Sequence, residues 1–110
     1  MQRLFVYGTL SPGRPNHHVV EKIAGTWEAA TVQGVLVEEG WGAAFGSPGL
    51  VLRADGDEVH GYMLQSPELD EYLPMLDEFE GDEYRRVVGQ VRGVNSGEVD
   101  AYLYVLSREV

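Results

Sequence analysis

Leu4-Phe5-Val6-Tyr7-Gly8-Thr9-Leu10 is an apolar run that stops at a glycine and is followed by a segment dense in turn formers, Ser11–Asn16. The run predicts a first buried strand over Leu4–Tyr7. Gly8 allows a tight turn and a close approach to a ligand, because it has no Cβ. Successive amides in such a turn can hold a carboxylate or a phosphate. An ordinary strand-to-loop turn explains the same residues, so this segment alone does not define a site.

Further strands are expected where β-rich apolar segments lie between turn formers. A β-hairpin turn is predicted at Asp55-Gly56-Asp57, and a closing hairpin turn at Asn95-Ser96-Gly97. Asn16 is the expected cap of a short helix over His17–Ile23. The expected strands after the first are Thr31–Val37, Leu50–Arg53, Val59–Leu64, Tyr84–Val91 and Val99–Leu106.

A second helix is expected after Ser66-Pro67, which combines a capping residue with a proline at the first helical position. Pro74 interrupts the helical pattern and predicts a kink or two short helices. Gly81 ends the segment. The apolar residues recur at spacings of three and four, which places on one face Leu69, Tyr72, Leu73, Leu76 and Phe79.

Six strands and two short helices that do not alternate regularly predict a mixed α/β (α+β) fold. The expected architecture is a small, mostly antiparallel β-barrel with short helices. A chain of 110 residues with 44% apolar content is the size of one domain with a real core. We therefore expect a single domain over residues 1–110.

Composition limits the classes of partner. The 18 acidic residues against 8 basic ones give a formal charge of −10, which disfavours nucleic acid and anionic membranes. Without cysteine there is no disulfide or thiolate metal site. The longest uncharged stretch, Gly40–Leu52, is too short for a membrane-spanning helix. The first apolar run is too short for a signal peptide. A cytoplasmic location is expected by default.

Common catalytic and cofactor motifs are not found in the sequence. It contains no glycine-rich phosphate loop and no G-x-S-x-G nucleophile elbow. His17 and His18 are adjacent, so on a helix they point in different directions, and His60 stands alone in a predicted strand. Catalytic zinc normally needs three protein ligands, so no metal is expected.

Glu80 is the carboxylate best placed for chemistry. It follows Leu76 by four residues and Leu73 by seven, which directs it towards the apolar face of the predicted helix. A carboxyl group at an apolar boundary can have a raised pKa, as a base working near neutral pH requires. A solvated glutamate at a helix end is the alternative interpretation.

Taken in order along the chain, several short motifs resemble the γ-glutamyl cyclotransferase-like family, which includes the γ-glutamylamine cyclotransferases and the AIG2-like proteins. The resemblance covers nearly the whole chain. It implies a small mixed α/β fold around a β-barrel, with a pocket between the Tyr-Gly-Thr-Leu loop and a glutamate. The motifs that carry it are Val6–Leu10, Pro12-Gly13, Pro15-Asn16-His17, Leu76–Gly81 and Tyr84-Arg85-Arg86.

The resemblance also implies roles for individual residues. Glu80 falls on the family's catalytic glutamate, and Arg86 on an arginine that is either structural or catalytic. Asn16 is a further supporting position. The residues implied to bind substrate are Tyr7, Gly8, Thr9, Leu10 and Tyr84.

Two segments depart from the family pattern. Pro74 lies inside the helix that leads to Glu80, and the stretch Trp41–Gly49 does not match closely. Trp41, Phe45 and Tyr62 are candidates for the wall around the leaving group, although large aromatic residues are more often core.

The activity implied is cyclisation of a γ-glutamyl amine or γ-glutamyl amino acid to 5-oxoproline and a free amine, without cofactor or metal. A non-catalytic module that binds a small molecule in the same pocket is one alternative, because a fold does not fix a function. A hydrolase in which Glu80 activates water is another. The identity of the amine and the oligomeric state are not predicted.

Overall fold

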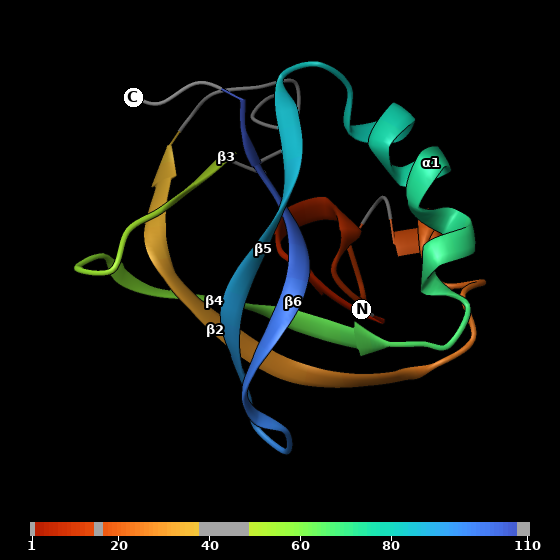
Figure 1. Cartoon of the computed structure of the whole chain (residues 1–110), viewed down its shortest axis with the longest axis horizontal. Helices are drawn as coiled ribbons and strands as arrows, with labels where there is room; N and C mark the ends of the chain where they lie inside the picture. Colours follow the sequence, from red (N-terminus) through yellow and green to blue (C-terminus); the bar gives the residue numbers. More distant parts are fainter. Residues whose placement is uncertain (1, 15–16, 38–48, 108–110) are drawn as a thin grey trace.

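The computed structural model describes residues 2–14, 17–37 and 49–107. Five of its strands close into a barrel in the order β2-β4-β1-β6-β5, and β3 extends from β2. The barrel closes where Ala30 and Thr31 pair with Gly93 and Arg92 (Figure 1). The strands are β1 (Arg3–Val6), β2 (Thr26–Val37), β3 (Gly49–Leu52), β4 (Asp57–Gln65), β5 (Tyr84–Gly93) and β6 (Gly97–Leu106).

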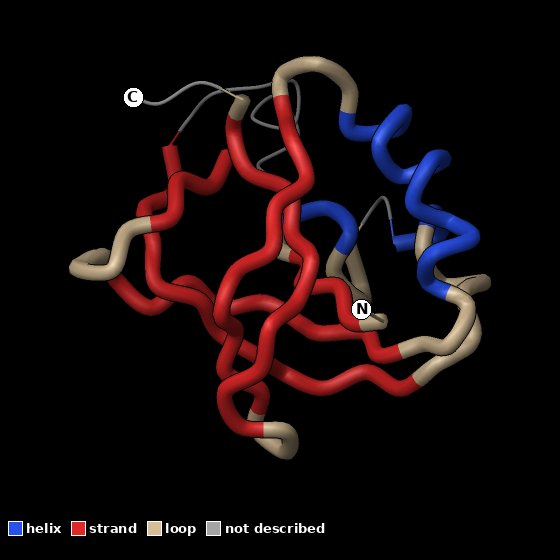
Figure 2. Tube along the Cα trace, in the orientation of Figure 1, coloured by secondary structure: helices blue, strands red, loops and turns tan. Residues whose placement is uncertain are grey.

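The mixed, mostly antiparallel barrel is confirmed. The β1–β6 pair is parallel, whereas the other paired strands of the described chain are antiparallel. One α-helix, α1 (Leu69–Glu80), lies along one side of the barrel, and Figure 2 shows how little else is helical. Two 3-10 helices, η1 (Gly8–Leu10) and η2 (His17–Val19), follow β1.

Two apolar clusters explain why β1 is apolar on both faces. Phe5 points into the barrel, while Leu4 and Val6 point to the side that α1 covers, as alternation along a strand requires. Strand β6 divides in the same way. Its residues in the barrel interior are Ala101, Leu103 and Val105, and Tyr104 faces the helix.

The predicted hairpin at Asp55-Gly56-Asp57 is wrong. β3 and β4 do not pair with each other but each pairs with β2, whose Gly34 is opposite Leu52 in one ladder and Asp57 in the other. A Cβ built on Gly56 would lie 2.6 Å from the carbonyl oxygen of Gly34, so the turn passes closely over β2. The turn residues were recognisable, but the strand lying between the two segments was not.

The central strand of this group, β2, was also predicted too short. β2 begins at Thr26 rather than at Thr31, although Glu28 and two alanines have low strand propensity. Pairing of Thr26–Ala30 with Gly61–Gln65 of β4 supplies the backbone hydrogen bonds that outweigh this propensity. The remaining predicted strands agree with the structure to within two residues at each end.

The helix predicted over His17–Ile23 is instead the single 3-10 turn η2 followed by further turns. Its predicted cap, Asn16, lies outside the described residues. Short helices in water need tertiary packing, and only Val20 and Ile23 of this segment are buried.

A kink or two short helices were expected at Pro74; α1 is one continuous helix through this residue, so the second alternative is wrong. Proline removes one backbone donor in the middle of the helix. The buried leucines Leu69, Leu73 and Leu76 hold the segment against the barrel. The helix begins after Ser66, whose hydroxyl accepts a hydrogen bond from the backbone N–H of Glu68 at 3.0 Å.

Candidate functional site

Glu80 is the last residue of α1 and is partly buried. Gly81 follows with φ of 78°, a conformation that favours glycine, and its N–H donates to the carbonyl of Asp77 at 3.1 Å. Desolvation raises the pKa of the Glu80 carboxyl from 4.5 to about 7. The carboxyl therefore exchanges a proton easily near neutral pH, as the position of Glu80 relative to Leu73 and Leu76 suggested.

The segment after β1 turns as the sequence predicted. Tyr7 is extended and Gly8 has φ of 68°, so the chain leaves the strand and forms η1 at once. The Leu10 side chain is buried in the core beneath α1, and its carbonyl oxygen lies 3.0 Å from Nδ1 of His17. Of Thr9, the structure describes only the backbone.

Tyr7 has a structural task that its sequence position did not indicate. Its hydroxyl donates to the carbonyl of Tyr104 at 2.7 Å and accepts from the backbone N–H of Leu50 at 3.1 Å. It thereby ties the end of β1 to β6 and to β3. Burial raises the pKa of the Tyr7 hydroxyl, and the neighbouring Glu80 charge adds to this effect. The hydroxyl is therefore protonated throughout the physiological range.

The structure brings the two predicted segments together. The charge of Glu80 raises the pKa of Tyr7 and of Tyr104, in both cases after the larger effect of burial, and Tyr84 also acts on Tyr7. Tyr7, which follows β1, and Tyr104 of β6 therefore lie within reach of the charge at the end of α1, and Tyr84 of β5 lies near Tyr7. Arg86 lies beyond them, paired with Asp77 at 3.1 Å.

Two residues next to the site were missed by the sequence analysis. Asp77 was given no role from the sequence, but it accepts a hydrogen bond of 2.6 Å from the hydroxyl of Tyr104. Tyr104 occupies the helix-facing side of β6 and is almost fully buried. A tyrosine alternating with apolar residues in β6 was the available signal, because a buried hydroxyl requires a partner.

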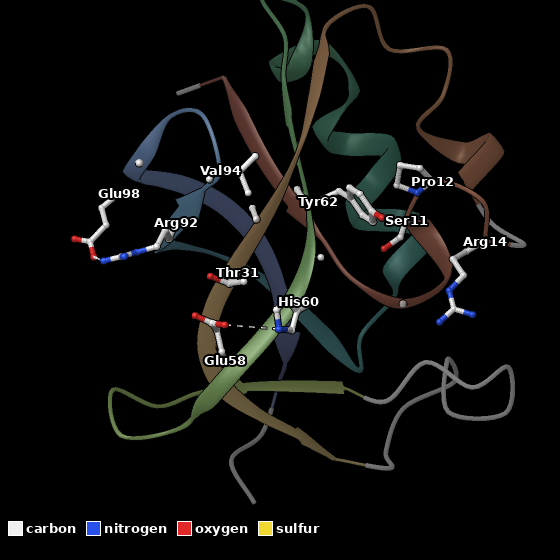
Figure 3. Close-up of a pocket in the computed structure, with 16 residues that line it drawn as sticks. Ser11, Pro12, Arg14, Thr31, Glu58, His60, Tyr62, Arg92, Val94 and Glu98 are labelled. Atoms are coloured by element: carbon white, nitrogen blue, oxygen red, sulfur yellow. Dashed lines mark hydrogen bonds and ion pairs between the residues drawn. The ribbon is translucent and has the colours of Figure 1, made fainter.

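Of the proposed leaving-group wall, Trp41 and Phe45 lie outside the described residues. Tyr62 lies on the outer face of β4, 38% exposed, and lines a separate cavity of about 890 Å³. Figure 3 shows this cavity, with Ser11 and Pro12 near Tyr62. It shares Gly8 with the candidate site, but the described lining includes neither Glu80 nor Tyr84.

Four of the polar side chains that line this outer cavity form two pairs. Arg92 lies 2.7 Å from Glu98, and His60 lies 3.6 Å from Glu58, all with largely exposed side chains. Exposed ion pairs of this kind are common on protein surfaces. The partly buried Glu80 is the better candidate for a reactive group, because its environment raises its pKa.

Within the described ranges, no three or more histidine and acidic side chains gather as a metal ion would need. None of the helices in the described part of the chain has the length and apolarity needed to cross a membrane.

The described chain thus combines a five-stranded barrel, a glycine turn after β1 and a partly buried glutamate at the end of α1. The chain belongs to the family described as gamma-glutamyl cyclotransferase, AIG2-like, whose model matches residues 4–110. None of the curated proteins compared with the chain matches it.

Solved structures agree with this assignment. An AIG2-like protein from Mus musculus is 27% identical with a TM-score of 0.72, covering 100% of this chain and 80% of that one. YkqA from Bacillus subtilis is 28% identical with a TM-score of 0.72 over 96% of this chain, which spans only 36% of that protein. A gamma-glutamyl cyclotransferase at 18% identity, with a TM-score of 0.63, covers 97% of this chain and 67% of its own and shares the fold.

Proposed function

We propose that the chain is a γ-glutamyl cyclotransferase that converts a γ-glutamyl amine or γ-glutamyl amino acid into 5-oxoproline and the free amine. Glu80 is the general acid and base. The observation that carries the proposal is the pKa of Glu80, raised by desolvation to about 7, in a carboxyl group whose charge acts on Tyr7, the residue before the Gly8 turn. Family membership supports the reaction type.

Substrate binding is assigned to the turn after β1. The first amide groups of a 3-10 helix have no partner within the helix and point out of its start. The amides of Gly8, Thr9 and Leu10 are therefore suited to hold the γ-glutamyl group, and the φ of 68° at Gly8 brings the backbone round to it. Tyr84 and Glu80 both act on the hydroxyl of Tyr7, which immediately precedes this turn, so we assign Tyr84 to the same binding site.

The reaction needs positioning more than it needs a protein nucleophile. The α-nitrogen of the substrate attacks its own γ-carbonyl carbon, a bond forms to close the five-membered ring, and the γ-amide carbon–nitrogen bond breaks. Holding the folded substrate in this geometry can lower the barrier by roughly 7–11 kcal/mol.

Glu80 moves the protons. Its carboxylate takes one from the α-ammonium so that the nitrogen can attack, and it returns that proton to the departing amine. The second proton lost by the ring nitrogen leaves with the amine, as its ammonium form, or with solvent. A positioned acid and base of this kind typically contributes about 10²–10⁴-fold to the rate.

The test is incubation of purified protein with a panel of γ-glutamyl amines and γ-glutamyl dipeptides, followed by mass spectrometry for 5-oxoproline. Glu80→Gln keeps the shape of the side chain and is expected to lower kcat by about 10²–10⁴-fold. Glu78→Gln, an exposed carboxylate on the same helix, is the matched control and is expected to retain full activity.

The other possible outcomes support a different function or a different catalytic residue. Release of glutamate in place of 5-oxoproline identifies a hydrolase. Saturable binding of a panel member without any product identifies a non-catalytic binding module. Unchanged turnover in Glu80→Gln shows that another group moves the proton.

A further inference from the structure

A line of polar side chains connects the last turn of α1 to the hairpin of β5 and β6. The hydroxyl of Tyr104 donates to Oδ1 of Asp77 at 2.6 Å. Nη1 of Arg86 lies 3.2 Å from the same oxygen and 3.1 Å from Oδ2. The guanidinium of Arg86 in turn lies over the ring of Tyr102, 5.1 Å from its centre.

The hydrogen bond from Tyr104 is the strongest part of this line. A hydroxyl-to-carboxylate bond of 2.6 Å has the length of a charge-assisted hydrogen bond. Tyr104 is only 4% exposed, so its hydroxyl cannot exchange this partner for water without cost. The ion pair between Asp77 and Arg86 is more exposed and contributes less by itself.

Asp77 is three residues before Glu80, so the two side chains stem from the same turn of α1. Its backbone carbonyl accepts from the N–H of Gly81, the bond that ends the helix. Tyr104 is anchored from the other side, because its own carbonyl accepts from the hydroxyl of Tyr7 at 2.7 Å. Asp77 is therefore linked, through one buried tyrosine, to the residue immediately before Gly8.

We propose that Asp77 and Tyr104 are positioning residues, which hold the last turn of α1 against the barrel so that Glu80 faces the Gly8–Leu10 turn. Arg86 supports them by balancing the charge of Asp77. The proposal rests on the proposed function, because it assigns these residues a task in the reaction of Glu80. Neither residue needs to touch the substrate.

The protonation of Glu80 depends on the same packing. Besides Asp77 on its own helix, the titratable groups of the described chain on which its charge acts include Tyr7, which follows β1, and Tyr104 of β6. From β5, Tyr84 acts on Tyr7, and Arg86 pairs with Asp77. Desolvation is the cause that raises the pKa of Glu80. Loosening the last turn of α1 lets water reach the carboxyl and lowers its pKa towards the ordinary value.

The variants are Tyr104→Phe, which removes the hydroxyl and keeps the ring, Asp77→Ala, and the two combined. We expect kcat for 5-oxoproline formation to fall about 10- to 100-fold in each single variant, with KM changed by less than about threefold. The double variant is expected to lose no more than the worse single variant, since both remove the same bond. Tyr72→Phe and Asp70→Asn, on the same helix, are the controls and are expected to behave as wild type.

A second readout does not depend on catalysis. With ¹³C-labelled glutamate, the side-chain signal missing from Glu80→Gln identifies Glu80, and its titration is followed by NMR. We expect the titration midpoint, near 7 in the wild type, to fall by at least about half a unit in Tyr104→Phe and in Asp77→Ala. The controls are expected to leave it in place.

An unchanged midpoint in folded Tyr104→Phe and Asp77→Ala overturns the proposal, whether or not the wild type is active. A loss of kcat that only follows the loss of folded protein, measured by thermal unfolding, also overturns it. If the wild type makes no 5-oxoproline but the midpoint falls as expected, the proposed function fails and the positioning of Glu80 stands.

Discussion

At the scale of single residues, Gly8 and Gly13 have similar backbone conformations, so Gly13 can serve as the control for substitution of Gly8. Both have left-handed backbone, with φ of 68° and 81°, and both belong to the segment between β1 and η2. A Cβ on Gly13 would meet no atom within 4 Å, so its substitution adds backbone strain without a clash. Gly8 differs because it begins the turn assigned to the substrate.

Gly8→Ala and Gly13→Ala are each expected to lower the free energy of unfolding by roughly 1–2 kcal/mol, the cost of left-handed backbone for alanine. Only Gly8→Ala is expected to raise KM or lower kcat for 5-oxoproline formation. Urea unfolding and steady-state kinetics measure the two effects. Equal kinetic losses in both variants contradict the assignment of substrate binding to Gly8.

Glu80 makes stability depend on pH in a definite direction. Its folded-state pKa of about 7 lies above the ordinary 4.5, so the folded protein binds the proton more tightly than the unfolded chain. Its contribution to stability is complete below about pH 4.5 and is lost as pH rises to about 7.

Glu80→Gln removes this dependence. Relative to wild type, the variant is expected to gain stability steadily between about pH 4.5 and 7, by up to about 3 kcal/mol in total. Urea unfolding at several pH values, with Glu78→Gln as control, measures the difference. Parallel curves for wild type and Glu80→Gln rule out a raised pKa at this carboxyl.

At the scale of elements, the β5–β6 hairpin is held by a side chain from another strand. Glu28 of β2 accepts hydrogen bonds from the N–H of Asn95, the N–H of Ser96 and the hydroxyl of Ser96, at 3.1, 3.0 and 2.7 Å. Burial is the largest single cause and raises the pKa of Glu28, but the three hydrogen bonds together outweigh it, and the net effect lowers the pKa. The carboxylate therefore fixes the hairpin tip against β2.

Glu28→Ala is expected to lower the free energy of unfolding by roughly 1 kcal/mol at neutral pH, because the bonds are largely exposed. The difference in unfolding free energy between wild type and Glu28→Ala is expected to disappear in acid, as pH falls through the lowered pKa of Glu28. The protonated carboxyl accepts these hydrogen bonds less strongly than the carboxylate does. Amide hydrogen exchange at Asn95 and Ser96 gives the local measurement. Glu21→Ala, an exposed carboxylate outside the sheet, is the control.

The sequence predicted elements better than their pairing. The apolar run Leu4–Val6 and the composition of the last two strands were sufficient to find β1, β5 and β6. The order β3-β2-β4 was not predictable from Asp55-Gly56-Asp57. The residues of a turn do not show whether the two strands that it connects pair with each other or with a third strand between them. Glu80 was found from its spacing to Leu73, whereas Asp77 was missed because its partner, Tyr104, is distant in sequence.

At the scale of the whole molecule, the barrel interior leaves no room at Gly61 of β4. A Cβ there would lie 2.2 Å from the carbonyl oxygen of Val6 and 2.7 Å from the ring of Phe5. The backbone oxygen cannot rotate away as a side chain would. Gly61 therefore sets how closely β4 and β1 approach.

Gly61→Ala is expected to destabilise the protein by about 1–3 kcal/mol through overpacking. The measurement is the midpoint of urea unfolding at unchanged slope. His60→Ala, on the outward face of the same strand, is expected to leave the midpoint nearly unchanged. A wild-type midpoint for Gly61→Ala shows that β1 can shift outward without loss.

The bond between Tyr7 and the backbone of Tyr104 joins positions 97 residues apart. Bringing such distant segments together costs chain entropy before the new contacts can offset that cost. Folds dominated by contacts of this kind therefore form slowly. The strand that leads into the Gly8 turn gains its β6 neighbour only when the two ends of the domain meet. Under the proposed function, activity therefore depends on this contact between the two ends of the domain. A chain released before β6 is complete holds all the proposed reacting residues but no working arrangement of them.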